Sequence, residues 1–357
     1  MTDYQETTTE ISYTEYNADL KSLNKASYQK SNDQSSSLPD GYNLFVKPVQ
    51  GGEIKVKMSD CSGKKKALLI GINYIGTQFE LKGCINDVQR IKKFLIEHGF
   101  NESDMIILTD DQRDRNKIPT RENITKYIKE LVSDPQKNDS YFFHFSGHGG
   151  QLADKNEDEE DGYDETILPL DWQKAGQIID DELHHLLVDP LPEGVRLTVV
   201  FDSCHSGTVL DLPYVYSTRG TIKQPKILLQ GAKSVLNTGL RFFQGELESL
   251  RESAKLLATK AMSGHVIRRK NLETLSSTAD IVMFSGCKDE QTSADAHEGG
   301  QATGAMSFAL IKSLSRDHKQ TYKELLNSIR DILREKYAQR PQLSASHPME
   351  MESPFTI

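Results

Sequence analysis

The stretch YFFHFSGHGG, residues 141–150, decides the fold, because a run of apolar residues leads there directly into a glycine-rich turn. Such a run indicates a strand that is buried on both faces of a sheet. The stretch RLTVVFDSCHSG, residues 196–207, has the same form. Ligand sites of open α/β sheets form at the carboxyl ends of the strands, so we expect the two turns to face one crevice.

Apolar runs alternate with amphipathic stretches on both sides of these two segments. We expect further strands at residues 66–72, 105–108 and 280–284, and helices at residues 86–100, 120–132, 180–187 and 321–333. Asn86 is expected to cap the first helix and Gly99 to end it. Thr321 and Glu324 form a capping box for the last helix. The alternation predicts an α/β fold.

Each of the two turns carries one side chain suited to nucleophilic catalysis. Cys204 follows one strand and His148 follows the other. A free thiol has a pKa near 8.5 and a histidine a pKa near 6.5, so the imidazole can take the thiol proton and return it to a leaving amine. The backbone amides of Gly149 and Cys204 are the expected donors to the oxyanion.

Simpler interpretations remain open for these residues. A cysteine just after an apolar strand is most often a small buried residue. His205 beside Cys204 suggests a metal site, but no further ligands stand at zinc spacing in the sequence. His184 and His185 lie in a predicted helix, where they are expected at the surface or in packing.

Several motifs, in their order along the chain, resemble one family. FSGHGG and FDSCHSG place His148 and Cys204 at a separation of 56 positions. With KALLIGINYIGT, LKGCIND, TREN, VLDLPY, DEQTSAD and PQLSAS, they resemble type I metacaspases of the fungal kind, within the caspase-like clan. The Q-A-C motif of caspases themselves is absent from the sequence. The resemblance covers residues 61–357 and implies a caspase-like three-layer α/β/α sandwich with a mostly parallel central sheet, extra antiparallel strands and a monomeric enzyme.

The resemblance also implies an activity, that of a calcium-dependent cysteine endopeptidase that cleaves proteins and peptides after arginine or lysine. Asp87 and Asp202 match the acids of the family's S1 pocket, and Cys84 and Ser146 match residues that line it. Two carboxylates can hold a guanidinium through paired hydrogen bonds. The alternative interpretations are a helix-start carboxylate for Asp87 and a turn residue for Asp202.

Calcium binding is implied by a second set of acids, which match the family's ion-binding positions: Asp164, Asp180, Asp181 and Asp211. Hard oxygen ligands in this number suit calcium, although the pattern is not an EF-hand loop. An ion that links these segments would order the crevice and make activity calcium-dependent. Alternatively, Asp180 is a helix cap and the acidic stretch at residues 156–165 is a solvated surface loop.

The rest of the chain is interpreted as regulatory. Residues 1–60 are polar with no apolar period, and we interpret them as a flexible prodomain ahead of a peptidase domain at residues 61–357. Residues 216–277 are basic and leucine-rich with no strand signal, and connections this long are unusual without a function. The resemblance implies a zymogen that cleaves itself there, with Lys255 and Lys260 as the expected sites.

Composition excludes several other classes. The net charge of −9 argues against a general affinity for nucleic acid. No apolar run approaches the ~18 residues of a membrane span, and the first residues lack the pattern of a secretory signal. The four cysteines are widely spaced, which fits a reducing compartment. We expect the protein in the cytoplasm, with the nucleus as the alternative location. The family's associations are programmed cell death and protein quality control.

Two competing functions are open at this point. One is a non-catalytic scaffold that binds calcium, aggregates or partners while the crevice is dispensable. The other is a caspase of aspartate specificity, which is disfavoured because its pocket would need basic residues where this chain has Asp87 and Asp202.

Overall fold

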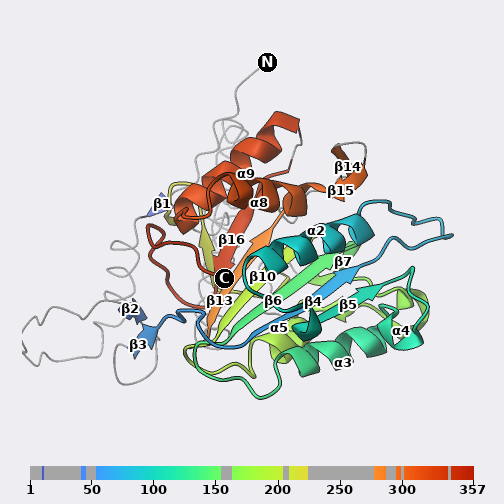
Figure 1. Ribbon diagram of the computed structural model, residues 1–357, viewed down its shortest axis with the longest axis horizontal. Helices are drawn as coiled ribbons and strands as arrows, with labels where there is room; N and C mark the ends of the chain where they lie inside the picture. The colour runs from blue at the N-terminus through green and yellow to red at the C-terminus, as the bar shows by residue number, and fades with distance from the viewer. Residues whose placement is uncertain are drawn as a thin grey trace, which may run out of the picture.

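A nine-stranded sheet forms the centre of the molecule, in the strand order β1-β12-β11-β16-β13-β10-β6-β4-β5 (Figure 1). This computed structural model describes residues 10–11, 42–45, 54–153, 163–203, 209–223, 277–286, 295–298, 301–336 and 339–357. Parallel pairing joins the neighbouring strands β13, Asp280–Ser285, β10, Arg196–Asp202, β6, Ser140–Ser146, β4, Lys65–Gly71, and β5, Met105–Thr109. These are the five strands expected from the apolar runs, so that prediction is confirmed.

Antiparallel strands extend the sheet beyond β13. They are β16, Gln342–Ala345, β11, Tyr214–Tyr216, β12, Ile222–Lys223, and β1, Glu10–Ile11. β12 falls in the stretch 216–277, for which the expectation of no strand is therefore wrong at its start. Residues 1–60 contain β1 and the hairpin of β2, Tyr42–Phe45, with β3, Ile54–Lys57. Strands of two to four residues are too short to show a hydrophobic period, so the sequence pattern does not reveal them.

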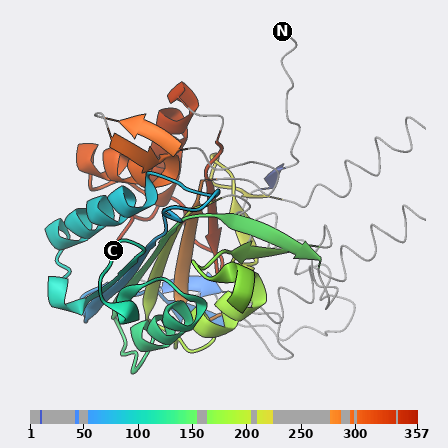
Figure 2. The same cartoon turned by 90° about the vertical axis from the view of Figure 1, so that its right-hand side faces the viewer.

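Helices cover both faces of the sheet (Figures 1 and 2). One face carries α2, Cys84–Glu97, α8, Ala305–Arg316, and α9, Tyr322–Lys336. The other carries α3, Arg121–Leu131, α4, Trp172–Ala175, and α5, Asp180–Leu187. Successive strand residues point to opposite faces, so Leu69 packs in the first layer of core and Leu68 in the second. The expected three-layer α/β/α sandwich is confirmed.

The start of α2 differs from the prediction. The helix begins at Cys84, so Asn86 lies inside it and is not its cap. The side-chain oxygen of Asn73 accepts hydrogen bonds from the amides of Cys84 at 3.0 Å and Ile85 at 3.4 Å. The cap is therefore supplied from the loop after β4. Asn73 is 11 residues before Cys84, so the residues next to the helix start do not reveal it. Gly99 ends the helix in a left-handed conformation, as expected.

Other helix starts agree with the sequence. Thr120 caps α3 by accepting a hydrogen bond from the amide of Asn123. Thr321 and Glu324 exchange side-chain to backbone hydrogen bonds at 2.8 and 3.2 Å, which confirms the capping box of α9.

Smaller elements surround the carboxyl end of β6. A three-stranded antiparallel sheet consists of β7, Gly149–Ala153, β8, Tyr163–Ile167, and β9, Ile178–Ile179. A hairpin of β14, Asp295–Glu298, and β15, Gln301–Gly304, leads into α8, and single 3-10 turns lie at Glu102–Asp104 and Arg115–Lys117. Asp164 and Glu165 of β8 are buried, so the acidic stretch is not a surface loop at this end.

A buried ionic network holds the opposite, amino-terminal end of the sheet together. Arg196 contacts Asp280 through Nη2 at 2.6 Å and Nε at 2.9 Å, and both side chains are almost fully buried. Asp280 also accepts a hydrogen bond from the amide of Ser59, and Arg196 donates to the hydroxyl of Tyr322 and the carbonyl of Thr356.

None of the helices in the described residues has the length and apolar character of a membrane span.

Candidate active site

The two turns singled out in the sequence follow adjacent strands. β6 and β10 pair in parallel, with Ser146 opposite Asp202, the last residue of each strand. The amide of Gly147 donates to the carbonyl of Asp202 at 3.4 Å, so the two strand ends are joined beyond the ladder. His148 comes two residues after Ser146, beyond the carboxyl end of β6. Cys204 comes two residues after Asp202 in the chain, and its placement lies outside the described residues, as does that of His205.

His148 is held by backbone groups. Its Nε2 lies 2.8 Å from the carbonyl oxygen of Phe79. A carbonyl can only accept a hydrogen bond, so Nε2 carries the proton and Nδ1 keeps its lone pair. Nδ1 is therefore the ring atom that can act as a base. The sequence offered no sign of Phe79, because its contribution is a main-chain oxygen.

Tyr74 fixes the backbone of the same histidine. Its hydroxyl accepts a hydrogen bond from the amide of His148 at 3.0 Å and donates one to the carbonyl of Leu168 at 2.6 Å. The Tyr74 and His148 rings lie 4.8 Å apart, and Phe79 packs edge-on against both His148 and Trp172. Tyr74 has a φ of 51°, a strained value that costs on the order of 1 kcal/mol. The side chains of Tyr74 and Phe79, which set the position of the histidine, belong to the loop after β4.

Three of the four predicted pocket residues come together at the strand ends. Asp87, on the first turn of α2, is fully buried and accepts a hydrogen bond from the hydroxyl of Ser146 at 2.8 Å. Asp202 at the end of β10 is also buried. Both carboxylates reach the start of α8: the amide of Gly304 donates to Asp87, and the amide of Ser307 donates to Asp202 at 2.7 Å.

Cys84, the fourth predicted pocket residue, is buried one helical turn before Asp87. Its carbonyl lies so close to β4 that a Cβ on Gly71 would be 2.5 Å away, and this packing sets the height of α2 above the sheet. Within the described residues, α8 has no side-chain cap of its own, because the two carboxylates take that place. Sequence reasoning identified the acids but missed Gly304 and Ser307.

The predicted calcium ligands lie on neighbouring segments. Asp164 is on β8, and Asp180 at the start of α5 accepts hydrogen bonds from the amides of Glu165 at 2.5 Å and Asp181 at 2.9 Å. Burial, with smaller contributions from the charges of Glu165 and Asp164, raises the pKa of Asp180 to about 8, although the two amide bonds act in the opposite direction.

Leu210, the residue before Asp211, contacts the same helix. His184 of α5 is buried, and its Nδ1 lies 2.8 Å from the carbonyl oxygen of Leu210, while His185 is exposed. The expectation that these histidines are packing and surface residues is confirmed. In the described part of the chain, no group of three or more His, Cys, Asp or Glu side chains is arranged to hold a metal ion. The oxygen donors suit calcium chemically, but they are not gathered into a ligand set.

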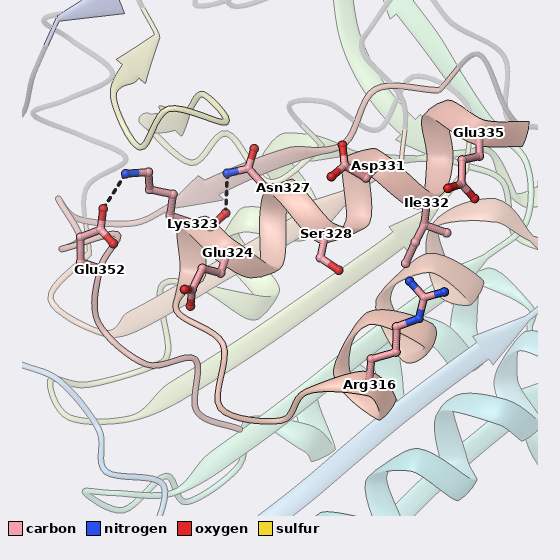
Figure 3. Close-up of a pocket in the computed structure, with 9 residues that line it drawn as sticks. All are labelled: Arg316, Lys323, Glu324, Asn327, Ser328, Asp331, Ile332, Glu335 and Glu352. Carbon is pink, nitrogen blue, oxygen red and sulfur yellow. Dashed lines mark hydrogen bonds and ion pairs between the residues drawn. The ribbon is translucent and has the colours of Figure 1, made fainter.

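A groove of about 520 Å³ lies elsewhere, between the end of α8 and α9 (Figure 3). It is lined by Arg316, Lys323, Glu324, Asn327, Ser328, Asp331, Ile332, Glu335 and Glu352. Arg316 is the last residue of α8, and a helix of 12 residues spans roughly 18 Å. Arg316 is therefore about that far from Gly304, and the groove contains none of the predicted site residues.

Comparison with known proteins agrees with this arrangement. Residues 65–213 match the family model described as "Metacaspase, peptidase C14 domain". Metacaspase-1 of Mycosarcoma maydis is 50% identical over 311 residues, which are 86% of this chain and 77% of the relative. Metacaspase-1B of Neurospora crassa is 46% identical over 341 residues, 95% of this chain and 80% of the relative. The crystal structure of protein GSU0716 from Geobacter sulfurreducens aligns with a TM-score of 0.50 and 25% identity, covering 81% of this chain and 95% of that chain.

Proposed function

Because the chain belongs to the metacaspase family of cysteine peptidases, we propose that it cleaves protein substrates after arginine or lysine, in a calcium-dependent manner, with Cys204 as nucleophile and His148 as base. The observation that carries the proposal is a pair of buried carboxylates beside the strand ends that lead to these two residues: Asp202 ends β10, and Asp87 of α2 binds Ser146 at the end of β6. Their charge favours a cationic side chain and opposes an acidic one.

The reaction follows from the orientation of His148. Nδ1 takes the proton of the Cys204 thiol as sulfur attacks the scissile carbonyl carbon, and the carbonyl oxygen becomes negatively charged. The amides of Gly149 and Cys204 donate hydrogen bonds to this oxyanion. His148 then returns the proton to the leaving amine, and a thioester forms. Water, deprotonated by the same nitrogen, releases the acid and regenerates the thiol. The carbonyl of Phe79 supports the imidazolium that forms in both steps.

Specificity at the first position is proposed to come from Asp87 and Asp202. A guanidinium binds two carboxylates with several hydrogen bonds in a plane, and a lysine ammonium uses the same charge with less directional contact. The alternative role is purely structural, since both acids accept hydrogen bonds from α8. Substitution by asparagine separates the two roles, because its side-chain oxygen still accepts from the helix while the negative charge is lost.

The first prediction concerns peptides that end in arginine or aspartate before a fluorescent leaving group. Wild-type protein with calcium is expected to release the fluorophore from the arginine peptide only, and Cys204→Ala from neither. Asp87→Asn and Asp202→Asn are each expected to lose about 10- to 150-fold in kcat/KM for arginine, because each removes a charge-assisted contact that is worth roughly 1.5–3 kcal/mol in a desolvated site.

Three results would contradict the proposal. Cleavage after aspartate would overturn the pocket, and full arginine activity in both asparagine variants would assign the two acids to capping alone. If freshly reduced wild type released no fluorophore under any condition, a non-catalytic scaffold would be favoured. The cellular role of such a scaffold should survive Cys204→Ala.

The calcium proposal rests on family membership and on the burial of Asp164 and Asp180 beside Glu165. Like charges held together away from water are costly, and a divalent cation would offset that cost. Asp164, Asp180, Asp181 and Asp211 would hold the ion through carboxylate oxygens, after rearrangement, since they do not form a ligand set by themselves. When bound, calcium would supply a fixed positive charge that connects β8, α5 and the segment after the catalytic turn.

The second prediction tests this site. In Asp180→Asn and in Asp181→Asn, the calcium concentration for half-maximal activity is expected to rise at least tenfold, because each loses an ionic ligand. Calcium titrations of peptidase activity, and calorimetric binding to the same variants in a Cys204→Ala background, measure the change. Asp189→Asn is the control, since Asp189 lies beyond the end of α5 and is half exposed. An unchanged calcium response in both variants would reject these ligands.

The remaining proposals concern regulation. Residues 1–60 are proposed to be a prodomain, 61–357 the peptidase domain, and residues around 216–277 a processing insertion in a monomeric, cytoplasmic or nuclear zymogen. Lys255 and Lys260, the proposed cleavage sites, lie outside the described residues. Sequencing the amino termini of fragments that form with calcium tests them, because fragments that start elsewhere would reject both sites.

A further inference from the structure

The backbone conformation of residue 304 does not require a glycine. Its φ of −71° and ψ of 140° are values that alanine adopts without strain. A Cβ at this position would lie 2.2 Å from Oδ2 of Asp202 and 2.4 Å from its Cγ. Atoms cannot approach so closely, so the carboxylate of Asp202 occupies the space that any side chain at position 304 would need.

The same turn of α8 also binds the second carboxylate. The amide of Gly304 lies 2.9 and 2.8 Å from the two oxygens of Asp87, and the amide of Ser307 holds Asp202. Gly304 is the N-cap of α8 and Ser307 is in its first turn. One helical turn therefore fixes where both acids lie relative to each other.

Ser307 is in turn anchored to the sheet. Its hydroxyl lies 2.9 Å from Nε2 of His144, a fully buried residue of β6. Burial lowers the pKa of His144 to about 3, so the ring is neutral at physiological pH and adds no charge beside the acids. His144 lies two residues before Ser146, which donates to Asp87. The contact between His144 and Ser307 thus ties α8 to the strand that carries the pocket serine.

From these contacts we propose that the first turn of α8 determines specificity for a guanidinium side chain: Gly304 sets the positions of Asp87 and Asp202, and Ser307 and His144 are positioning residues behind it. The inference deepens the proposed function and rests on it, because it assigns these residues to the same pocket. None of them is expected to touch the reacting thiol or imidazole.

The ratio of arginine to lysine cleavage is the property that this arrangement predicts. A guanidinium is planar and needs its acceptors at fixed positions, whereas an ammonium is a point charge that tolerates displaced carboxylates. Moving Asp202 should therefore reduce cleavage after arginine more than cleavage after lysine. A general loss of folding or of thiol reactivity would instead reduce both equally.

The experiment compares full-length Gly304→Ala and Ser307→Ala with wild type on matched arginine and lysine peptides. Ser313→Ala is the control, because Ser313 is a second buried serine of α8 whose hydroxyl also binds a side chain, that of Gln320, away from the pocket. The rate of Cys204 alkylation by iodoacetamide reports the state of the nucleophile and its base independently of the pocket.

Gly304→Ala is expected to lose about 100-fold in kcat/KM for arginine, mainly through KM, since a displacement of about 1 Å can cost that much. Its loss for lysine is expected to be at least fivefold smaller. Ser307→Ala keeps the amide bond and should lose about tenfold for arginine, with the same direction of change in the ratio. Ser313→Ala should match wild type, and alkylation rates should stay within about threefold in every variant.

Equal losses for arginine and lysine, or alkylation that falls in parallel with cleavage, would overturn the inference, as would arginine activity of both variants equal to wild type. If Gly304→Ala does not fold, Ser307→Ala decides alone. Failure of the proposed pocket would look different, because wild type itself would then not prefer basic peptides, or Asp87→Asn and Asp202→Asn would retain full activity.

Discussion

Alanine at position 148 is expected to lower kcat/KM for an arginine peptide by on the order of 10⁴-fold at neutral pH, a loss second only to that of Cys204→Ala. Without Nδ1 of His148, the proposed base for the thiol proton and the proposed acid for the leaving amine are both lost. The remaining activity should rise as the pH approaches the ordinary pKa of a thiol, about 8.5, because the thiolate then forms without a base.

Initial rates between pH 6 and pH 9.5 measure this effect. His185→Ala is the matched control, since His185 is exposed on α5 and its ring contacts only Asp189 among the described residues. It should follow the wild-type profile. A His148→Ala variant that keeps more than about a tenth of wild-type activity at pH 7 would show that another group is the base.

The largest expected loss of stability is that of Asp280→Ala, whose free energy of unfolding should fall by about 3–5 kcal/mol. The substitution leaves the guanidinium of Arg196 buried without its closest counter-charge. It also removes the acceptor for the amide of Ser59. Chemical denaturation followed by fluorescence measures the change. The double variant Arg196→Met with Asp280→Leu should be less destabilised than Asp280→Ala, because no unpaired charge remains. A double variant as unstable as the single one would contradict this account.

The same carboxylate gives the stability a defined pH dependence. Burial alone would raise the pKa of Asp280, but attraction by Arg196 and then by His347 outweighs burial, and the pKa is lowered. A group whose pKa is lower in the folded protein stabilises it above the unfolded value, about 3.9, and this contribution is lost as the pH falls further. Wild type should therefore lose stability steeply below pH 4, and Asp280→Ala less steeply.

The sheet could be predicted because its central strands are long and apolar on both faces, so that β6 and β10 stand out against their surroundings. The antiparallel strands β1, β12 and β11 could not, because two or three residues carry no period. The acidic end of β8 was misjudged for a related reason: charge predicts exposure only where no partner is available, and Asp164 and Glu165 lie on a strand that pairs on both sides.

The site was predictable only where side chains carry the chemistry. His148 stood out because of its residue type and position, and Asp87 and Asp202 because of the family resemblance. The carbonyl of Phe79 and the amide of Gly304 are main-chain groups that every residue except proline possesses, so no letter in the sequence marks them. Asp87 and Gly304 are also separated by 217 positions, and only folding brings them into contact.

The capping of α8 by Asp87 and Asp202 has a consequence for how such an enzyme can diverge. In the proposed pocket, a change of preference from basic to acidic substrates would call for arginine or lysine in place of these acids. Either replacement would put a positive charge against the amino-terminal end of a helix and remove the acceptors of two amides. Reversal of the preference would then require a new helix start as well. A single substitution in the pocket would lower stability, and selection would remove it before a new specificity could arise.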